Sequence, residues 1–339
     1  MTASIRVLFP AAAEIAALPA FARSAEAWGF DELWVVEDCF ASGGLTMAAT
    51  ALAVTERLRV GVGLLPAVVR NPAIVAMEIA ALARLHPDRF SATFGHGVRG
   101  WMAQIGAVPP DRLAALREVV AAVRALLAGE RVTVHGRSVQ LADVSLDNPP
   151  DRVPPVLIGT TGERGLALAA QVADGLLLPE GCGPAFIGQA RDRVAAARRG
   201  SFRTAVYAWL AIDDDDRRAR SALAPAVAHW LDSGLYPGPV AAAGMSAGTA
   251  PGELTAEQAG ELALAGDAHA CAAAVRRWAQ AGADAVILTA PGPGWQSQYE
   301  RFGSEVLPLL EGARRSDDRP PRPPRPPRSP GATGRESGV

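Results

Sequence analysis

The sequence predicts a single α/β domain, a (β/α)8 TIM barrel with insertions, because three observations agree. Eight short apolar segments alternate with segments of helical periodicity, which is the order of strands and helices in a parallel barrel. The composition shows no marked shift before residue 312, which favours one domain over two. With 339 residues and 49% hydrophobic residues, the chain is large enough to fill such a core.

The first half of the chain supplies four strands. We expect them at 5–9, 32–37, 58–65 and 89–94, with helices at 18–28, at 45–55 and from Asn71 to Leu85. Asn71 can cap the third helix, and Pro72 suits its first turn because a missing N–H costs nothing there. The third strand contains Gly61 and Gly63 and the fourth ends in Gly95, on the side where parallel barrels place their ligands.

The second half contains the other four strands, two insertions and a tail. The strands are expected at 156–158, 174–178, 204–212 and 285–289. Residues near 131–142 alternate around Gly136-Arg137 and predict an inserted β-hairpin. Residues near 234–266 are rich in glycine, alanine and proline, which predicts an irregular insertion that could contain helices. The arginine- and proline-rich segment 313–339 lacks apolar side chains, so we expect it to be disordered.

Composition excludes several classes of function. The net charge of −2 and the pI of about 6.2 do not favour a nucleic acid or membrane partner. The chain has no lysine, which excludes Schiff-base and P-loop chemistry. Its three cysteines lie far apart and its histidines lack metal-ligand spacing, so we expect no metal and the reduced thiols of a cytoplasmic protein. Neither a signal peptide nor a membrane-spanning run is found in the sequence.

Four candidate catalytic residues lie where predicted strands end: Glu14, Asp38, Cys39 and His96. Each could move a proton or contact a cofactor in a barrel of this type. Each also has a structural interpretation, since a loop aspartate often caps a turn and Glu14 could simply be solvated. His96 is the best histidine because Gly95 and Gly97 on either side leave room for a ligand, although this spacing alone is a weak signal.

The strongest binding signal is a glycine-rich turn between the strand at 156–158 and the following helix. Its residues are Gly159, Thr160, Thr161, Gly162, Glu163, Arg164 and Gly165. Backbone N–H groups at a helix N-terminus, two threonine hydroxyls and an arginine together suit a phosphate. The alternative is an ordinary strand-to-helix turn.

Several motifs in this arrangement resemble the bacterial luciferase-like monooxygenase superfamily. They are VGVGLLPAVV followed by R-N-P and a long helix, then D-R-F and a strand ending in glycine, then PPVLIG with ADGLLLP. The resemblance covers about residues 1–312. Its nearest branch is identified as the enzymes that use the deazaflavin F420 and are similar to methylenetetrahydromethanopterin reductase.

The resemblance implies an F420-dependent oxidoreductase that transfers a hydride between F420 and a small organic substrate, usually as a homodimer. It places a non-prolyl cis peptide at Gly63-Leu64 against the deazaflavin ring, and Asp38 near that ring. The cofactor-binding residues carried over are Gly63, Leu64, Gly95, Gly97, Gly159, Thr160, Thr161, Gly162, Arg164 and Gly165.

The chain departs from its relatives at two positions. Cys39 stands where many relatives have histidine, and Val98 and Arg99 stand where sugar-phosphate-oxidising members use a glutamate. That particular dehydrogenase activity is therefore not expected. Two other functions stay open: an FMN-dependent monooxygenase of the same superfamily, and a barrel that binds a cofactor without catalysis.

Overall fold

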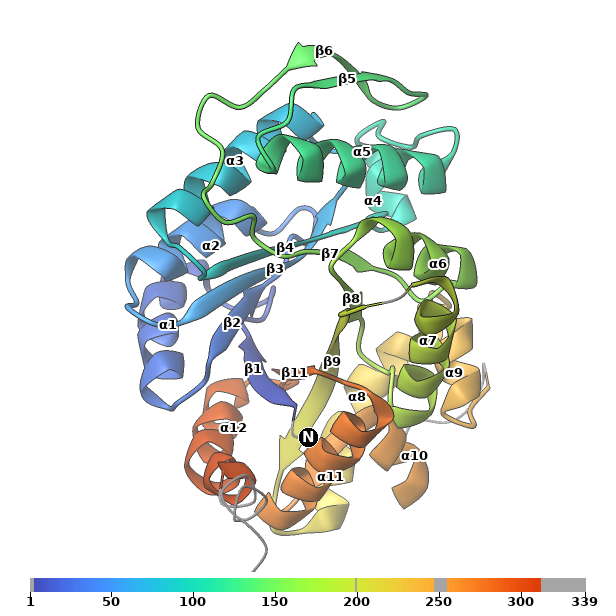
Figure 1. Ribbon diagram of the computed structural model, residues 1–339. Helices are drawn as coiled ribbons and strands as arrows, with labels where there is room; N and C mark the ends of the chain where they lie inside the picture. Colours follow the sequence, from blue (N-terminus) through green and yellow to red (C-terminus); the bar gives the residue numbers. More distant parts are fainter. Residues whose placement is uncertain (1–2, 199, 247–254, 312–339) are drawn as a thin grey trace, which may run out of the picture.

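Eight parallel strands close into a barrel, which confirms the predicted fold class (Figure 1). The computed structural model describes residues 3–198, 200–246 and 255–311. The strand order is β1-β2-β3-β4-β7-β8-β9-β11, and β11 pairs with β1 to close the ring. The tail at 313–339 lies outside the described residues.

The elements follow the predicted alternation closely. The barrel strands are β1 Ser4–Leu8, β2 Glu32–Val35, β3 Arg59–Pro66, β4 Phe90–Gly95, β7 Val156–Gly159, β8 Gly175–Leu178, β9 Arg203–Ile212 and β11 Ala285–Thr289. The helices around them are α1 Leu18–Ala27, α2 Gly44–Ala53, α3 Pro72–Leu85, α5 Arg112–Leu127, α6 Glu163–Val172, α7 Pro184–Ala197, α8 Asp216–Asp232, α11 Ala268–Ala281 and α12 Trp295–Arg301. Two short helices, η1 Ile15–Ala17 and α4 Arg99–Gln104, lie in loops, and a π-helical turn at Phe302–Val306 continues α12.

Side-chain caps fix where several helices begin. The Asn71 side chain accepts a hydrogen bond from the backbone N–H of Ala73, and Pro72 is the first helical residue, as expected. Asp111 and Asp215 cap α5 and α8 in the same way. These caps stabilise helix starts by about 1 kcal/mol each.

Alternation along the strands separates two apolar layers. Outward-facing residues such as Val7, Val60 and Val206 pack beneath the helices in the main core. The inward-facing set forms a second cluster inside the barrel, made of Leu8, Trp34, Leu157, Leu177, Ala205, Tyr207, Ala285 and Ile287. At the opposite end of the barrel from the strand C-termini, Arg6 pairs with the buried Glu32 at 3.1 Å.

Two segments depart from the simple alternation. The strands β5 Val132–His135 and β6 Gln140–Val144 form an antiparallel hairpin beside α5 (Figure 1). The second segment holds α9 Pro237–Ala242, α10 Ala256–Leu262 and β10 Ala263–Gly266. Expecting residues near 234–266 to be irregular was wrong for the last four, because β10 pairs in parallel with the upper half of β9. None of the described helices is long and apolar enough to cross a membrane.

Candidate active site

The floor of the barrel mouth is built around Gly63. The peptide bond Gly63-Leu64 is cis, as the resemblance implied. The buried Tyr207 hydroxyl, on the strand opposite β3, donates a hydrogen bond of 3.0 Å to the Gly63 carbonyl. A Cβ at position 63 would lie 2.4 Å from the Tyr207 hydroxyl oxygen and 2.7 Å from Leu177. Glycine is therefore required here for close packing across the barrel.

The Leu64 side chain lies over two of the glycines that we expected at the cofactor. A Cβ at Gly95 would come within 2.5 Å of Leu64, and one at Gly159 within 2.6 Å. Both glycines thus make room for leucine in the floor, which is a reason for glycine that does not require a ligand. Contact of these two residues with a cofactor remains a prediction.

Above β4 and β7 the mouth has two arginines; we call this part the arginine side and define it by Arg112, Arg164 and the N-terminus of α6. Asp111 and Glu163 lie beside these arginines, and Glu163 is paired with Arg193. Arg112 donates to the carbonyl of Gly97, which has a positive φ of 66°. Burial and then the charge of Arg112 lower the pKa of His96, favouring the neutral imidazole.

The glycine-rich turn at the start of α6 keeps its N-terminal N–H groups free of a side-chain cap. Thr160 packs directly on Gly165, where a Cβ would meet its hydroxyl oxygen, and Gly162 faces open space. Arg164 and Thr161 stand at the same turn, and the positive charge of Arg164 helps to lower the pKa of Asp111 after backbone hydrogen bonding. An uncapped helix start beside arginines suits an anionic group.

The part of the mouth next to the arginine side, at the end of β8, holds Glu180, and we call it the carboxylate side. Asp38 follows β2, which is opposite β8 in the ring. Burial and then the charge of Asp38 raise the pKa of Glu180 to about 7. Desolvation also raises the pKa of Asp38, although its side chain reaches solvent at the rim. Glu180 was not among the predicted site residues.

The loop that carries Glu180 is held tightly on its far side. Gly181 has a positive φ of 81° and packs against the Trp230 ring, which would lie 2.3 Å from an added Cβ. Cys182 is fully buried, and the carboxylate of Glu261 accepts a hydrogen bond from the Ala185 N–H. Helix α8, through Trp230, and helix α10, through Glu261, therefore hold the loop that follows Glu180.

Two predicted catalytic residues have less supportive surroundings. Cys39 lies beside the ion pair of Glu37 with Arg70, whose oxygens and nitrogens are 2.6 and 2.7 Å apart. Desolvation and then the charges of Glu37 and Asp38 raise the pKa of Cys39, so its thiol stays protonated. Glu14 is exposed and precedes η1, where its backbone carbonyl accepts a hydrogen bond from the Ala17 N–H. Within the described ranges, no cluster of three or more potential metal ligands occurs.

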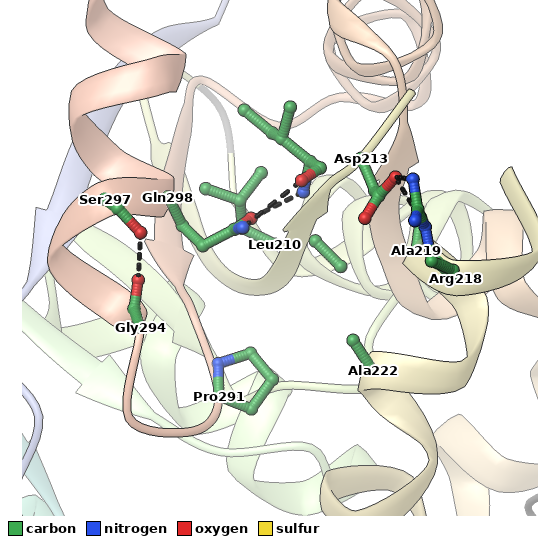
Figure 2. A pocket seen from close by; sticks show the side chains of 11 residues that line it. Leu210, Asp213, Arg218, Ala219, Ala222, Pro291, Gly294, Ser297 and Gln298 are labelled. Carbon is green, nitrogen blue, oxygen red and sulfur yellow. Dashed lines mark hydrogen bonds and ion pairs between the residues drawn. The ribbon is translucent and has the colours of Figure 1, made fainter. Parts of the chain in front are cut away.

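A pocket of about 140 Å³ opens beside the mouth, between the end of β9, α8 and the loop before α12 (Figure 2). Asp213 and Arg218 form an ion pair of 3.1 Å on one wall. On the other wall the Gln298 side chain bonds both backbone groups of Ile212. A smaller cavity of about 90 Å³ lies between Leu8, Trp209 and Tyr299. Both cavities open where β9 and β11 end.

The protein is a parallel (β/α)8 barrel, a class whose enzymes place their active sites at the C-terminal ends of the strands. The pattern of the luciferase-like monooxygenase family matches residues 3–285, and the chain belongs to this family.

Two curated relatives align along nearly their whole length. The 5,10-methylenetetrahydromethanopterin reductase of Methanolobus tindarius is 26% identical over 316 residues, which cover 85% of this chain and 94% of the relative. The F420-dependent glucose-6-phosphate dehydrogenase of Kineococcus radiotolerans is also 26% identical, over 313 residues that cover 86% and 91%.

Solved structures support the same fold. The coenzyme F420 dependent tetrahydromethanopterin reductase from Methanopyrus kandleri superposes with a TM-score of 0.77 at 20% identity, covering 91% of this chain and 100% of that one. The oxygenating constituent of 3,6-diketocamphane monooxygenase from Pseudomonas putida, in complex with FMN, gives 0.72 at 14%, covering 91% and 99%. The relatives and structural neighbours thus include enzymes named for F420 and one in complex with FMN.

Proposed function

We propose that this protein is an F420-dependent oxidoreductase that transfers a hydride between F420 and a small organic substrate. The observation that carries the proposal is the floor at Gly63-Leu64, braced from across the barrel by Tyr207. The F420-dependent relatives at 26% identity support the choice of cofactor.

The residues present fit a flat ring with an anionic tail. Leu8, Leu64 and Leu177 give the floor an apolar surface against which a ring can lie. The uncapped start of α6 and the arginine side can hold the phosphate of the tail. When bound, F420 supplies the carbon centre that gives or accepts the hydride.

Proton transfer then falls to the protein. Glu180, with a pKa of about 7, can both hold and release a proton near neutral pH. Asp38 lies near enough for its charge to act on Glu180, and the neutral His96 can accept a proton on the arginine side. Tyr207, fully engaged with the Gly63 carbonyl and with its pKa raised by burial, serves to position the floor.

The test is a titration of apo protein with F420 and, separately, with FMN, followed by the fluorescence of each cofactor. We expect F420 to bind more tightly, and the variant Arg164→Gln to weaken its binding. Arg117→Gln is the matched control, because Arg117 is exposed and donates only to Gln171 on the outer surface. Failure of F420 to bind would overturn the proposal.

The second candidate is an FMN-dependent monooxygenase, favoured by the structural likeness to the FMN-bound diketocamphane enzyme. Tighter binding of FMN in the same titration, with substrate-dependent oxygen consumption, would favour it over the F420 reaction. These outcomes separate the two enzymes because a deazaflavin reaction consumes no oxygen.

We also propose that the protein is a homodimer. Helix α3 leaves large apolar side chains open to solvent, with Ile74 51%, Met77 54% and Leu85 72% exposed. Such side chains on one helix are typical of an interface between subunits. Light scattering coupled to size exclusion measures the mass, and we expect the double variant Ile74→Glu/Met77→Glu to be monomeric.

A further inference from the structure

We propose that the smaller cavity at the barrel mouth binds an alkyl group of the substrate, and that this part of the substrate carries no charge. The inference rests on the proposed function, because it takes the floor at Gly63-Leu64 as the place of the cofactor ring. It adds a substrate class and two residues, Trp209 and Thr289, that determine the size of the group that fits.

The cavity lies directly beside the floor. Its volume is about 90 Å³, and its lining includes Leu8, which also contributes to the apolar surface of the floor. Trp209, another lining residue, lies two positions after Tyr207 on the inward face of β9. It therefore stands about 7 Å closer to the mouth than the residue that braces Gly63. A group held in this cavity would adjoin a ring that lies on the floor.

The cavity and the arginine side occupy opposite sectors of the barrel. Leu8, Thr289 and Trp209 come from β1, β11 and β9, which are neighbours in the ring. The floor and the arginine side belong to β3, β4 and β7, which face those three strands across the barrel. A cofactor on one sector and a substrate group on the other can therefore occupy the mouth together.

The lining of the cavity suits an apolar group. Besides Leu8, Trp209 and Thr289, it consists of Pro10, Ala290, Pro291 and Tyr299, so among the described residues no charged side chain lines it. Both hydroxyl groups of the lining are already engaged. That of Thr289 donates to the carbonyl of Ala208. That of Tyr299 lies 3.0 and 2.9 Å from the carbonyls of Leu8 and Leu288 and accepts from the Ala290 N–H.

This lining discriminates against charge. An ammonium or carboxylate group in the cavity would lose its hydration without gaining a partner, which is costly. An alkyl group has no such hydration to lose, and its transfer from water to an apolar surface is favourable. The cavity therefore selects an uncharged alkyl group.

The walls are held in place by contacts outside the cavity. Trp209 meets Trp230 of α8 edge to face, with ring centroids 5.8 Å apart. Tyr299 of α12 is fully buried and fixed by its hydrogen bonds to the ends of β1 and β11. Because these walls are preorganised, a ligand does not have to order them when it binds.

The volume limits the size of the group. A cavity of roughly 150 Å³ holds benzene, so the smaller volume here suits an alkyl group of about four carbons. Trp209 and Thr289 set this limit because they are paired across β9 and β11 and both line the cavity.

The experiment uses butan-1-ol, butylamine and butyrate, which share one alkyl chain and are neutral, positive and negative near pH 7. Each is titrated into the protein with F420 bound, and saturation-transfer NMR of the probe gives its dissociation constant. We expect butan-1-ol to bind at least about tenfold more tightly than either charged probe. From ethanol to butan-1-ol the affinity should rise about threefold to fourfold for each added CH₂.

Two substitutions change the cavity in opposite directions. Thr289→Leu fills part of it and should weaken butan-1-ol by about tenfold. Trp209→Leu enlarges it and should make hexan-1-ol bind at least about threefold more tightly than butan-1-ol. Ser297→Leu is the matched control, because Ser297 lines the larger pocket of Figure 2 and its hydroxyl donates to the Gly294 carbonyl. It should leave butan-1-ol affinity within about twofold.

The comparison of probes in the wild type decides the inference even if a variant does not fold. Tighter binding of a charged probe, equal binding of all three or no binding of butan-1-ol would overturn it. So would expulsion of butan-1-ol by F420, because the cavity would then belong to the cofactor site.

Failure of the proposed function gives a different result. If F420 does not bind, the same titrations with the apo protein still decide whether the cavity prefers an alkyl group, and only its link to hydride transfer is lost. Binding of F420 without binding of butan-1-ol would reject the substrate class and leave the cofactor assignment standing.

Discussion

The arginine side and the carboxylate side share one floor but offer opposite charges. Arg112 and Arg164 accompany a helix start whose N–H groups have no side-chain cap, whereas the start of α7, on the carboxylate side, is already bonded by Glu261. A carboxylate thus occupies one helix N-terminus and leaves the other available to an anion. The two neighbouring helix starts therefore differ in whether a further anionic group can bind there.

The largest effect on stability is expected at Gly63, in the floor of the barrel mouth. Gly63→Val would place side-chain atoms where Tyr207, Leu177 and Trp34 already lie, with contacts of 2.4 to 2.8 Å from the Cβ alone. We expect a loss of more than about 3 kcal/mol in the free energy of unfolding, measured with urea. Gly162→Ala, at the N-cap of α6 with nothing within 4 Å, should cost no more than about 1 kcal/mol. A stable Gly63→Val protein would show that the floor is not close-packed.

The next prediction concerns F420 affinity, which should depend on the arginine side and not on Glu180. The double variant Arg112→Gln/Arg164→Gln should weaken F420 binding by about tenfold to a hundredfold, because charge-assisted contacts to an anion are lost. Fluorescence titration at low salt measures this change. Glu180→Gln should leave F420 affinity within about twofold. If Glu180→Gln weakened F420 as much as the arginine variant does, the division into two sides would be wrong.

A smaller effect tests the brace under the floor. Tyr207→Phe removes the hydroxyl that donates to the Gly63 carbonyl and leaves that buried oxygen without its partner. We expect a loss of about 1–3 kcal/mol in stability by urea unfolding. Because the ring is retained, its edge contact with Trp34 should persist. An unchanged midpoint would mean that water or another donor replaces the hydroxyl.

The smallest expected effect concerns the carboxylate side alone. The folded-state pKa of Glu180, about 7, lies above its ordinary value of 4.5, so the folded protein binds a proton that the unfolded chain releases. The stability that this provides is complete below about pH 4.5 and is lost as pH rises through about 7. Relative to Glu180→Gln, the wild type should lose stability across that window, by less than the roughly 3 kcal/mol of the full shift because Glu180 is partly exposed. Parallel curves for the two proteins would contradict the raised pKa.

The sequence predicted the barrel because its eight buried strands are apolar runs bounded by glycine, proline or polar residues. Strand β10 was missed because Ala263, Leu264, Ala265 and Gly266 include no β-branched or aromatic residue. Its pairing depends on the exposed upper edge of β9, which local sequence does not show. In β10, the pairing with β9 therefore outweighs the low strand propensity of its residues.

The candidate site was predicted in part, for a related reason. Position after a strand pointed to Asp38, which follows β2, and the same rule would also have selected Glu180, two residues after the end of β8. The rule gives the end of the barrel but not the direction of a side chain, so Glu14 was chosen although it is exposed. The loop after Glu180 is held by the packing of Gly181 on Trp230, 49 positions later in the chain, which no local pattern reveals.

The long strand β9 has a practical consequence for changing the substrate range of this protein. The first half of β9 pairs with β8 and its second half pairs with β10. The segment between α8 and β10 is therefore joined to the barrel by α8 at its start and by the β9–β10 pairing at its end. A loop exchanged between relatives should therefore start after Ser233 and stop before Ala263. A graft with these ends would replace Tyr236 and its neighbours and would leave the pairing of β9 with β8 and with β10 intact.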